Sequence, residues 1–377
     1  SSFLPPRYFD WVSLAPRINE ESSVDAAFMA LALHQYKQLP TTSAALRTTL
    51  DQVQNRFNFA AFSDTQAPTL GWKLAFNTST QSMTAGTYDG YSGEPWLISL
   101  AAELSQAHHV PITTHYHSGV FRSPDFVNSQ NNLHFVHSFE QFRAPFLQWL
   151  MPLFVDVSDR GVDTYPNPVL ATNPLRNAEK YQRDVDAFFA ALGRGLFLQP
   201  DAGDDGSGAF YQQFSAYDDH GRPDLFMPWS SAFSLWGDEP LGEAALRHHL
   251  EMLLHGPLGL ADSTRWTTGA GNYSALPAGM DLRNTALSTM ALLEWLYGDS
   301  QYLTSLAEVD AALDQVFRVP ADANADGCVS GADFTIWADH FGDGPGALFN
   351  NGDFNSDGFI TGAGRSFRRG MSPLGGA

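Results

Sequence analysis

The chain has 377 residues and a formal net charge of −20, with 41 acidic and 21 basic side chains. So acidic a surface argues against binding to nucleic acid or to anionic membranes. A single cysteine excludes a disulfide framework. No apolar run of about 18 residues is present, so we expect no membrane span. Because the sequence opens on Ser1, without methionine or a signal peptide, we expect a mature form or a fragment.

Helical patterns recur along the chain, whereas convincing strands do not. Residues 22–38 open with Ser22 and Asp25 in a capping-box pattern and continue with apolar residues at helical spacing. Residues 94–106 carry Pro95 where the first turn of a helix is expected. Further helices are predicted at 42–57, 138–151, 174–193, 239–255, 281–297 and 303–317.

Long segments rich in glycine, acids and aromatics connect these helices. Loops of such length inside a compact domain usually carry function, and we expect some short strands in them. The repeated alternation of helix and long loop predicts an all-α fold, an α/α toroid whose two concentric rings of helices leave a cleft between loops at one rim. The alternative is an irregular helical array without a central cleft. The longest connecting segments are 67–93, 108–136, 155–173 and 198–235.

Acids and aromatics concentrate in segment 87–104. Asp89 lies in a loop and Glu94 at the mouth of the following helix, while Tyr88, Tyr91 and Trp96 surround them. Glycoside hydrolysis requires two carboxylates, one to protonate the leaving oxygen and one to activate water. The segment therefore indicates a candidate catalytic site, although the helix dipole alone also favours an acid at the position of Glu94.

A second acidic pair, Asp218 and Asp219, is flanked by Tyr217 and His220. Such residues are typical of solvated turns, but the neighbouring aromatic ring makes this pair a candidate for the cleft as well. No glycine-rich phosphate loop and no G-x-S-x-G motif is present, so nucleotide binding and serine-hydrolase chemistry lack support.

Two acidic loops, 31 positions apart, lie near the C-terminus. Oxygen-bearing residues at positions one, three and five, followed by glycine at six, are the pattern of a calcium loop. Position seven contributes a backbone carbonyl, and position twelve a carboxylate. The first loop supplies Asp322, Asn324, Asp326, Cys328, Ser330 and Asp333, and the second supplies Asp353, Asn355, Asp357 and Phe359. An ordinary Asp/Asn/Gly turn is the alternative.

These duplicated loops, the first leading into the short helix ADFTIWADHFG, resemble type I dockerin repeats. The resemblance covers about residues 320–364 and implies a calcium-folded module that docks an extracellular partner, classically a cohesin. Two features depart from the pattern. Gly364 stands at position twelve of the second loop, and a basic tail over 365–377, expected to be disordered, follows it. We expect residues 318–321 to form a linker and 322–364 the module.

Three segments in the remaining chain, SSVDAAFMALAL, YDGYSGEPWLISLAAELS and HSFEQFRAPFLQWLMPLFVDVSDRGVDTYPNPVLATNPLRNAEKYQ, resemble the glycoamylase-like domain. This family includes bacterial endo-β-1,2-glucanases. The resemblance spans about residues 8–317. It implies an (α/α)6 toroid with an acidic, aromatic-lined cleft, and hydrolysis of a glucan with inversion.

Carried over by position, the resemblance places Asp25 on the acid of the family's VD segment. Glu94 matches the acid of its GYDE segment, and Asp156 that of its WIDF-like segment. Residues 227–240 resemble a further loop of the family, with Glu239 at the start of the next helix. Trp229 in that loop, like Trp96, is an apolar neighbour that could raise the pKa of a catalytic acid.

Two departures qualify this resemblance. Pro166 and Asn167 stand where relatives read an acid, a candidate proton donor, followed by Asn-Ser. The sequence also begins almost at the VD segment, so the toroid is expected to lack its first helices.

The sequence thus predicts a secreted bacterial glycoside hydrolase with calcium as a structural cofactor, acting on a polysaccharide and tethered to a cohesin-like protein. One catalytic carboxyl is Glu94 or Asp89 and the other Asp156, Asp218 or Asp219. One alternative is a non-catalytic carbohydrate-binding or cell-surface scaffold protein. Another is a calcium-dependent adhesion protein without sugar chemistry. The predicted substrate-binding residues are Asp25, Tyr88, Tyr91, Trp96, Trp229 and Glu239.

Overall fold

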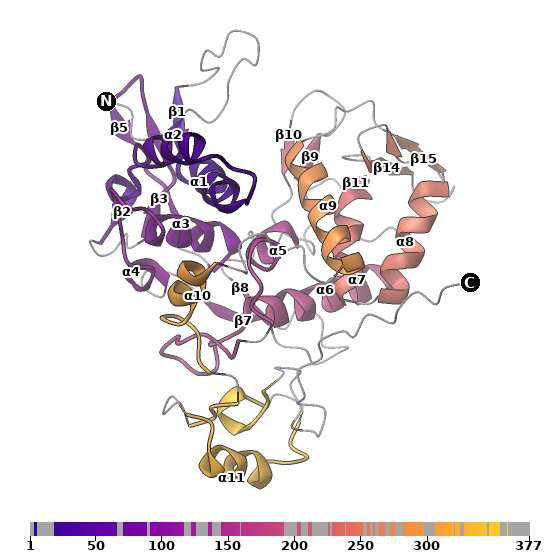
Figure 1. Cartoon of the computed structure of the whole chain (residues 1–377). Helices are drawn as coiled ribbons and strands as arrows, with labels where there is room; N and C mark the ends of the chain where they lie inside the picture. Colours follow the sequence, from indigo (N-terminus) through magenta and orange to yellow (C-terminus); the bar gives the residue numbers. More distant parts are fainter. Residues whose placement is uncertain are drawn as a thin grey trace. The chain divides into compact units, whose positions relative to one another are not determined.

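The structure is a computed structural model of the whole chain (Figure 1). It describes residues 4–5, 19–65, 71–88, 91–116, 122–125, 135–137, 145–158, 160–191, 202–204, 210–212, 225–226, 228–237, 239–251, 255–256, 259–260, 264–267, 272–275, 282–297, 306–319, 321–324, 328–344, 347–354 and 360. The chain forms two compact units. The first comprises residues 1–122 with 302–317, and the second comprises 123–301 with 318–377.

The first unit is built around one buried helix, α3 (Gly93–Glu103), against which α1 (Ser23–Gln38) packs. Ser22 begins α1 because its side chain accepts a hydrogen bond from the backbone N–H of Asp25, as the capping pattern predicts. Trp72 is fully buried beside α3, where its indole N–H donates to Ser99 at 2.9 Å. The other helices of this unit are α2 (Ala44–Gln54), η1 (Phe59–Phe62), α4 (Thr113–Tyr116) and α10 (Ala307–Leu313).

Two small antiparallel sheets flank these helices, with strand orders β1-β4-β5 and β2-β3-β6. The strands are β1 (Glu20–Ser22), β2 (Ser63–Asp64), β3 (Gly71–Lys73), β4 (Ala75–Asn77), β5 (Ser82–Met83) and β6 (Thr87–Tyr88). Trp72 of β3 pairs with Tyr88 of β6. The sheet therefore connects the buried Trp72 to the segment that precedes α3.

The second unit has its core between α5 (Pro145–Phe154), α6 (Pro174–Ala191) and α7 (Ser234–Gly237). Trp149 stacks on Phe233 at 5.8 Å between ring centroids, and its indole N–H donates to Gln182 at 3.1 Å. A buried polar group costs little when it is paired in this way. The other helices are η3 (Pro228–Phe233), α8 (Glu239–Glu251), α9 (Leu282–Tyr297), α11 (Gly331–Asp339) and η4 (Phe349–Asn351).

Short hairpins and one three-stranded sheet complete the second unit. Its strands are β7 (Ser123–Asp125), β8 (Phe135–His137), β9 (Ala202–Asp204), β10 (Phe210–Gln212), β11 (Leu225–Phe226), β12 (His255–Gly256), β13 (Gly259–Leu260), β14 (Thr264–Thr267) and β15 (Asn272–Ala275).

A helix is present in each of the eight predicted ranges. The helix predicted from 138 is described from Pro145 onward, because residues 138–144 lie outside the described residues. The short strands expected in the long connections are also present. Within the described residues, none of the helices combines the length and hydropathy that crossing a bilayer requires.

Candidate functional site

Glu94 is half-buried and lies in the first turn of α3, two residues after Ser92 at the N-cap. The side chain of Ser92 makes no capping hydrogen bond, so the carboxylate of Glu94 is the acid that the helix N-terminus receives. This position serves both interpretations, a catalytic carboxylate and a dipole-stabilising acid. Asp89, its predicted neighbour, lies outside the described residues.

The aromatic residues around Glu94 form a packed cluster. Tyr91 and Trp96 are each 4 % exposed, and their rings meet edge to face at 5.9 Å. Trp96 also contacts Tyr116 at 4.5 Å and Phe317 at 5.7 Å. Aromatic rings buried to this extent stabilise the fold. In this conformation they leave little ring surface on which a sugar could stack. Tyr88, at the end of β6, is half-buried.

Arg122 is a member of this cluster that the sequence did not suggest. It is 5 % exposed, and its guanidinium carbon lies 4.7 Å from the ring centroid of Tyr91. A guanidinium stays charged at any relevant pH, so its burial places a permanent cation beside the segment that leads to Glu94. Its only sequence signal was an arginine in a strongly acidic chain, which is too weak to single it out.

Two buried histidines lie in the same unit. Burial, and next the Lys37 charge, hold the pKa of His34 below its ordinary value, although Glu308 at 3.1 Å opposes the shift. Burial likewise lowers the pKa of His115, whose Nε2 lies 2.6 Å from the Ser63 hydroxyl. Both rings are therefore neutral at physiological pH.

Asp25 and Asp156 both lie near a helix end, where local hydrogen bonds form. Asp25 is half-buried in the first turn of α1, where its own N–H donates to Ser22. Asp156 follows α5, and its Oδ1 accepts the Ser158 N–H at 2.8 Å. Turn formation by an acidic side chain is common and needs no catalytic role.

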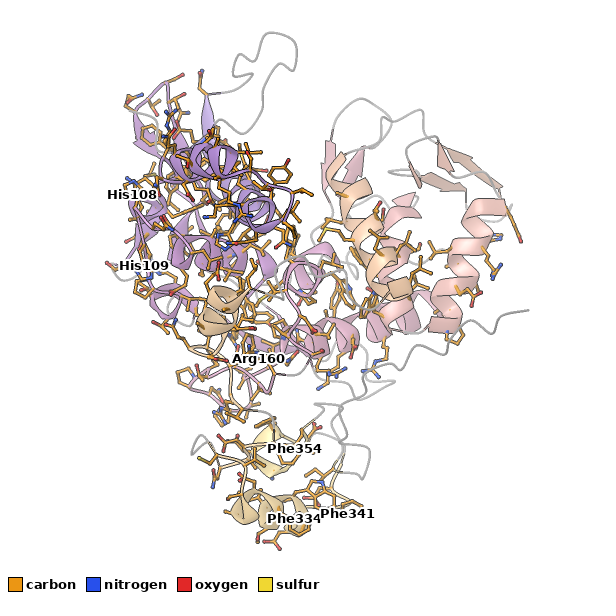
Figure 2. All side chains as sticks on the ribbon, viewed as in Figure 1. His108, His109, Arg160, Phe334, Phe341 and Phe354 are labelled. Atoms are coloured by element: carbon orange, nitrogen blue, oxygen red, sulfur yellow. The ribbon has the colours of Figure 1, made fainter. Side chains whose placement is uncertain are left out.

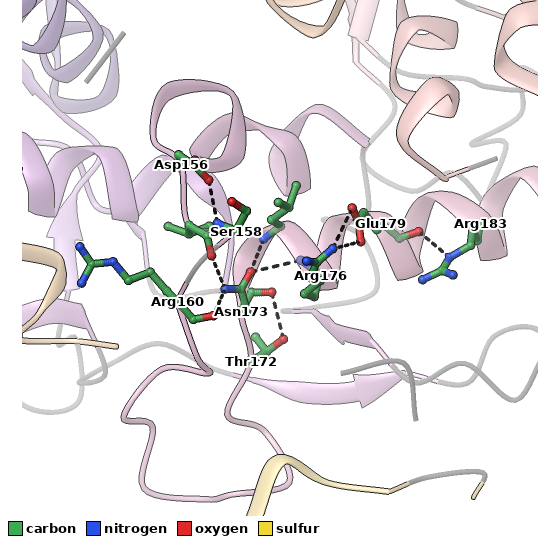
Figure 3. A network of polar contacts seen from close by, with 10 residues as sticks. Asp156, Ser158, Arg160, Thr172, Asn173, Arg176, Glu179 and Arg183 are labelled. Carbon is green, nitrogen blue, oxygen red and sulfur yellow. Dashed lines mark hydrogen bonds and ion pairs between the residues drawn. The ribbon is translucent and has the colours of Figure 1, made fainter. Parts of the chain in front are cut away.

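Figure 3 shows that Asp156 heads a turn fixed by Asn173. The Asn173 Nδ2 donates to the carbonyls of Val157 at 2.6 Å and Arg160 at 3.1 Å. Its Oδ1 accepts the Leu175 N–H at 3.0 Å, so the same side chain caps the start of α6. Asn173 was not predicted, because its bonds to residues 157 and 160 span at least 13 positions.

The segment between Asp156 and Asn173 also contains the departure from the family pattern. Pro166 and Asn167 are exposed, and Asn167 Oδ1 accepts the Val169 N–H at 3.1 Å. Asp163, the acid three positions earlier, is fully buried and accepts the Thr172 N–H at 3.3 Å. Because it is buried, Asp163 cannot take over a role in contact with substrate.

The remaining predicted residues of the cleft are only partly described. Asp218 and Asp219 lie outside the described residues. Trp229 lies in η3 and Glu239 is the first residue of α8, but the structure does not describe their side chains.

The three acids of the C-terminal loops that the structure describes are buried. Asp322, Asp333 and Asp353 are each at most 2 % exposed. Asp333 accepts hydrogen bonds from the Ser330 N–H at 2.7 Å and the Asn324 N–H at 3.2 Å. The Ser330 backbone N–H is the main reason that the pKa of Asp333 lies below its ordinary value.

These buried carboxylates fit a hard cation, because burial of an acid is costly unless it is compensated. Asp322 and Asp353 also occupy equivalent positions of the two loops. Among the described residues no cluster of three acidic, histidine or cysteine side chains is close enough to hold a metal. The predicted ligands Asp326, Asn355, Asp357 and Phe359 lie outside them. Cys328 is exposed, as suits a residue that would offer only its carbonyl.

Comparisons with known proteins give a likeness of fold. No family model matches the chain, and no curated protein matches it. A glucoamylase-like protein from Bacteroides fragilis superposes with a TM-score of 0.63 at 16% identity, over 85% of this chain and 78% of that one. The endo-β-1,2-glucanase from Chitinophaga pinensis, in complex with sophorotriose and glucose, superposes with a TM-score of 0.62 at 14% identity, over 80% and 72%.

A β-1,2-glucanase from Parabacteroides distasonis superposes with a TM-score of 0.60 at 12% identity, over 78% of this chain and 44% of that one. At these identities the likeness shows the fold alone. The chain therefore has the mostly helical fold of glucoamylase-like proteins and endo-β-1,2-glucanases, which is compatible with the predicted toroid.

Proposed function

We propose that this chain is a secreted bacterial glycoside hydrolase that cleaves a glucan, with β-1,2-glucan as the first candidate substrate. The observation that carries the proposal is the fold, which is shared with two β-1,2-glucanases, one of them in complex with sophorotriose. The position of Glu94 at a helix N-terminus, beside an aromatic cluster, supports it.

The proposed mechanism uses two carboxyl groups with inversion at the anomeric carbon. One protonates the leaving oxygen while the other removes a proton from the attacking water, and about 6.5–9.5 Å separates them in inverting enzymes. One of the two is Glu94 or Asp89, and its partner is Asp156, Asp218 or Asp219. Asp25, Tyr88, Trp229 and Glu239 are the proposed substrate-binding residues, whereas Tyr91 and Trp96, which the sequence also suggested, are buried rings that pack beside this segment.

The test is release of reducing ends from a panel of soluble glucans that includes β-1,2-glucan. We expect Glu94→Gln to lower the rate by at least about 10²-fold, since acid–base catalysis contributes about 10²–10⁴. Glu243→Gln is the matched control, because among the described residues Glu243 pairs with the largely exposed Arg247 on α8. No release from any glucan by a folded protein would refute the proposed activity.

One observation favours a second candidate, a non-catalytic carbohydrate-binding or scaffold protein. Pro166 replaces the acid of the family pattern in an exposed turn, and the nearby Asp163 is buried. Such a protein would retain affinity for a glucan in gel-retardation electrophoresis while releasing no reducing ends. The same pair of assays therefore separates the two candidates.

We further propose that residues 322–364 form a calcium-loaded module that tethers the chain to a cohesin-like protein. Support comes from Phe334 in α11 and Phe341 just after it, which are both more than half exposed (Figure 2). The ring of Trp337 lies 5.5 Å from that of Phe334 and 4.9 Å from that of Phe341. Exposed aromatic rings are typical of the centre of a protein interface.

The tether is tested with a purified type I cohesin domain in a pull-down, with calcium and with EGTA. We expect capture in calcium only, and loss of capture in Phe334→Ser/Phe341→Ser. Thr335→Ala is the control, since Thr335 only bonds its own helix at Gly331. Capture that is equal in EGTA, or absent in calcium, would contradict the proposal.

A further inference from the structure

The segment expected to link the module to the rest of the chain is hydrogen-bonded into the second unit. The N–H of Gly161 donates to the Arg318 carbonyl at 3.1 Å, and the N–H of Arg318 donates to the Val162 carbonyl at 2.8 Å. The two bonds join Arg318 to two successive residues of the facing segment, which is the arrangement of a β-bulge. At its first residue, therefore, the predicted linker 318–321 is a fixed part of the fold.

Side chains extend this contact into the module. The Arg318 guanidinium donates to Asn350 Oδ1 at 2.6 Å. A Cβ on Gly161 would lie 2.9 Å from the Arg318 carbonyl oxygen, 3.1 Å from that of Val319 and 3.2 Å from the ring of Phe349. Two of these three atoms belong to backbone, which cannot rotate away. Only glycine fits at position 161 without displacing Arg318, Val319 or the ring of Phe349.

The contact lies next to the second acidic loop. Asn350 belongs to η4, and Asp353, the first residue of that loop, donates its N–H to the Leu348 carbonyl at 3.1 Å. Gly352 between them has φ of 103° and approaches Trp337 of α11 so closely that a Cβ would lie 2.8 Å from its Cα. The first residue of the second loop is therefore hydrogen-bonded next to η4, which Arg318 contacts.

On its other side, Gly161 belongs to the turn that Asp156 heads. The Asn173 side chain reaches the Gly161 carbonyl at 3.4 Å, besides those of Val157 and Arg160. A chain of contacts thus runs from the module through Gly161 to the cap of α6 and to the turn after α5. Figure 3 shows the Asn173 end of this chain.

We propose that the C-terminal module has a second function besides docking: it braces residues 156–173, and calcium bound in its second loop tightens that brace through Asn350, Arg318 and Gly161. The brace itself stands on the contacts just described. Its calcium dependence rests on the proposed calcium loops, and its consequence for catalysis rests on the proposed role of Asp156. If calcium binds only the conformation in which the module contacts Gly161, it stabilises that conformation by mass action.

The test is hydrogen exchange of the full chain, followed by mass spectrometry of peptides that cover 156–173. At calcium concentrations about 100 times Kd, binding can reduce the separation of the module from residues 156–173, and hence the exchange that depends on it, by up to about a hundredfold. We expect exchange in these peptides to be markedly slower in calcium than in EGTA for the unchanged protein. Gly161→Val should exchange fast in both conditions.

Arg318→Met provides a second variant in case Gly161→Val fails to fold, and it should also lose the protection. Gly331→Ala is the matched control, because a Cβ at Gly331 meets nothing within 4 Å. Exchange in 156–173 that is the same in all variants would overturn the brace. A brace without a calcium effect, in a protein that titrates no calcium, would overturn the calcium dependence. None of these readouts requires glucan hydrolysis, so a failure of the proposed activity is recognised separately.

Discussion

The contact between Arg122 and Tyr91 gives a quantitative test of how the segment before Glu94 is held. The guanidinium lies 4.7 Å from the ring centroid, and the two side chains are only 5 % and 4 % exposed. A cation–π contact is worth about 0.5–1 kcal/mol at an exposed site and about 2 kcal/mol or more when desolvated. Because both partners are buried, we expect a coupling free energy of about 2 kcal/mol.

The assay is a double-mutant cycle of urea unfolding with Arg122→Met, Tyr91→Leu and the double variant. The cycle isolates the pairwise free energy from the other contacts that each side chain makes. Tyr91→Phe is the matched control, because it retains a ring and should retain most of the coupling. A coupling below about 0.5 kcal/mol would refute the reasoning, since that is the usual error of additivity between independent sites. Arg122 would then be held in the core by other partners.

Three further predictions concern named side chains. Trp96→Ala should lower the free energy of unfolding by about 3–5 kcal/mol. Trp96→Phe should lower it clearly less, because the Trp96 indole N–H is buried without a partner in the described part of the chain. Urea unfolding of both variants measures the difference. Asn173→Ala should lower the free energy of unfolding by about 1–2 kcal/mol, because the cap of α6 is lost. Asn173→Asp should lower it less, because its carboxylate oxygens still accept hydrogen bonds. Thermal unfolding compares the two variants, and equal losses of stability would contradict the capping role. For His34 and His115, burial lowers the folded-state pKa below 6.5, so the unfolded chain binds protons more readily. The stability contributed by each neutral histidine is therefore complete above pH 6.5 and is lost as the pH falls toward the folded-state pKa. We expect the melting temperature of His34→Gln and of His115→Gln to vary less between pH 8 and pH 5.5 than that of the unchanged protein.

The helices could be predicted because their signals are local. Ser22 and Ser43 lie next to the helices that they cap, and each accepts an N–H three residues further on. The strands gave no such signal, since β3 pairs with β2 and with β6 across the sheet. Trp72 illustrates the difficulty, because its hydrogen-bond partner Ser99 is 27 positions away. Burial of this kind depends on contacts that a sequence pattern does not carry.

The candidate site was predictable only in part, for a related reason. The sequence placed Tyr91 and Trp96 together, and their rings do meet, but composition cannot distinguish an exposed aromatic surface from a buried cluster. Arg122 and Asn173 are positioned by long-range contacts and gave no usable pattern. The acid–aromatic grouping was therefore predictable, whereas the residues that hold it in place were not.

The positions of the acids narrow the roles that they can take in the proposed reaction. A helix N-terminus favours negative charge, so Glu94 suits the carboxylate that activates water better than the acid that protonates the leaving oxygen. Asp163 is excluded from contact with substrate by its burial, and Pro166 has no proton to give. If the chain hydrolyses glucans, the proton must come from another carboxyl. Asp156, Asp218 and Asp219, the partners proposed for Glu94 or Asp89, are then the acids on which the catalytic and the non-catalytic proposals diverge.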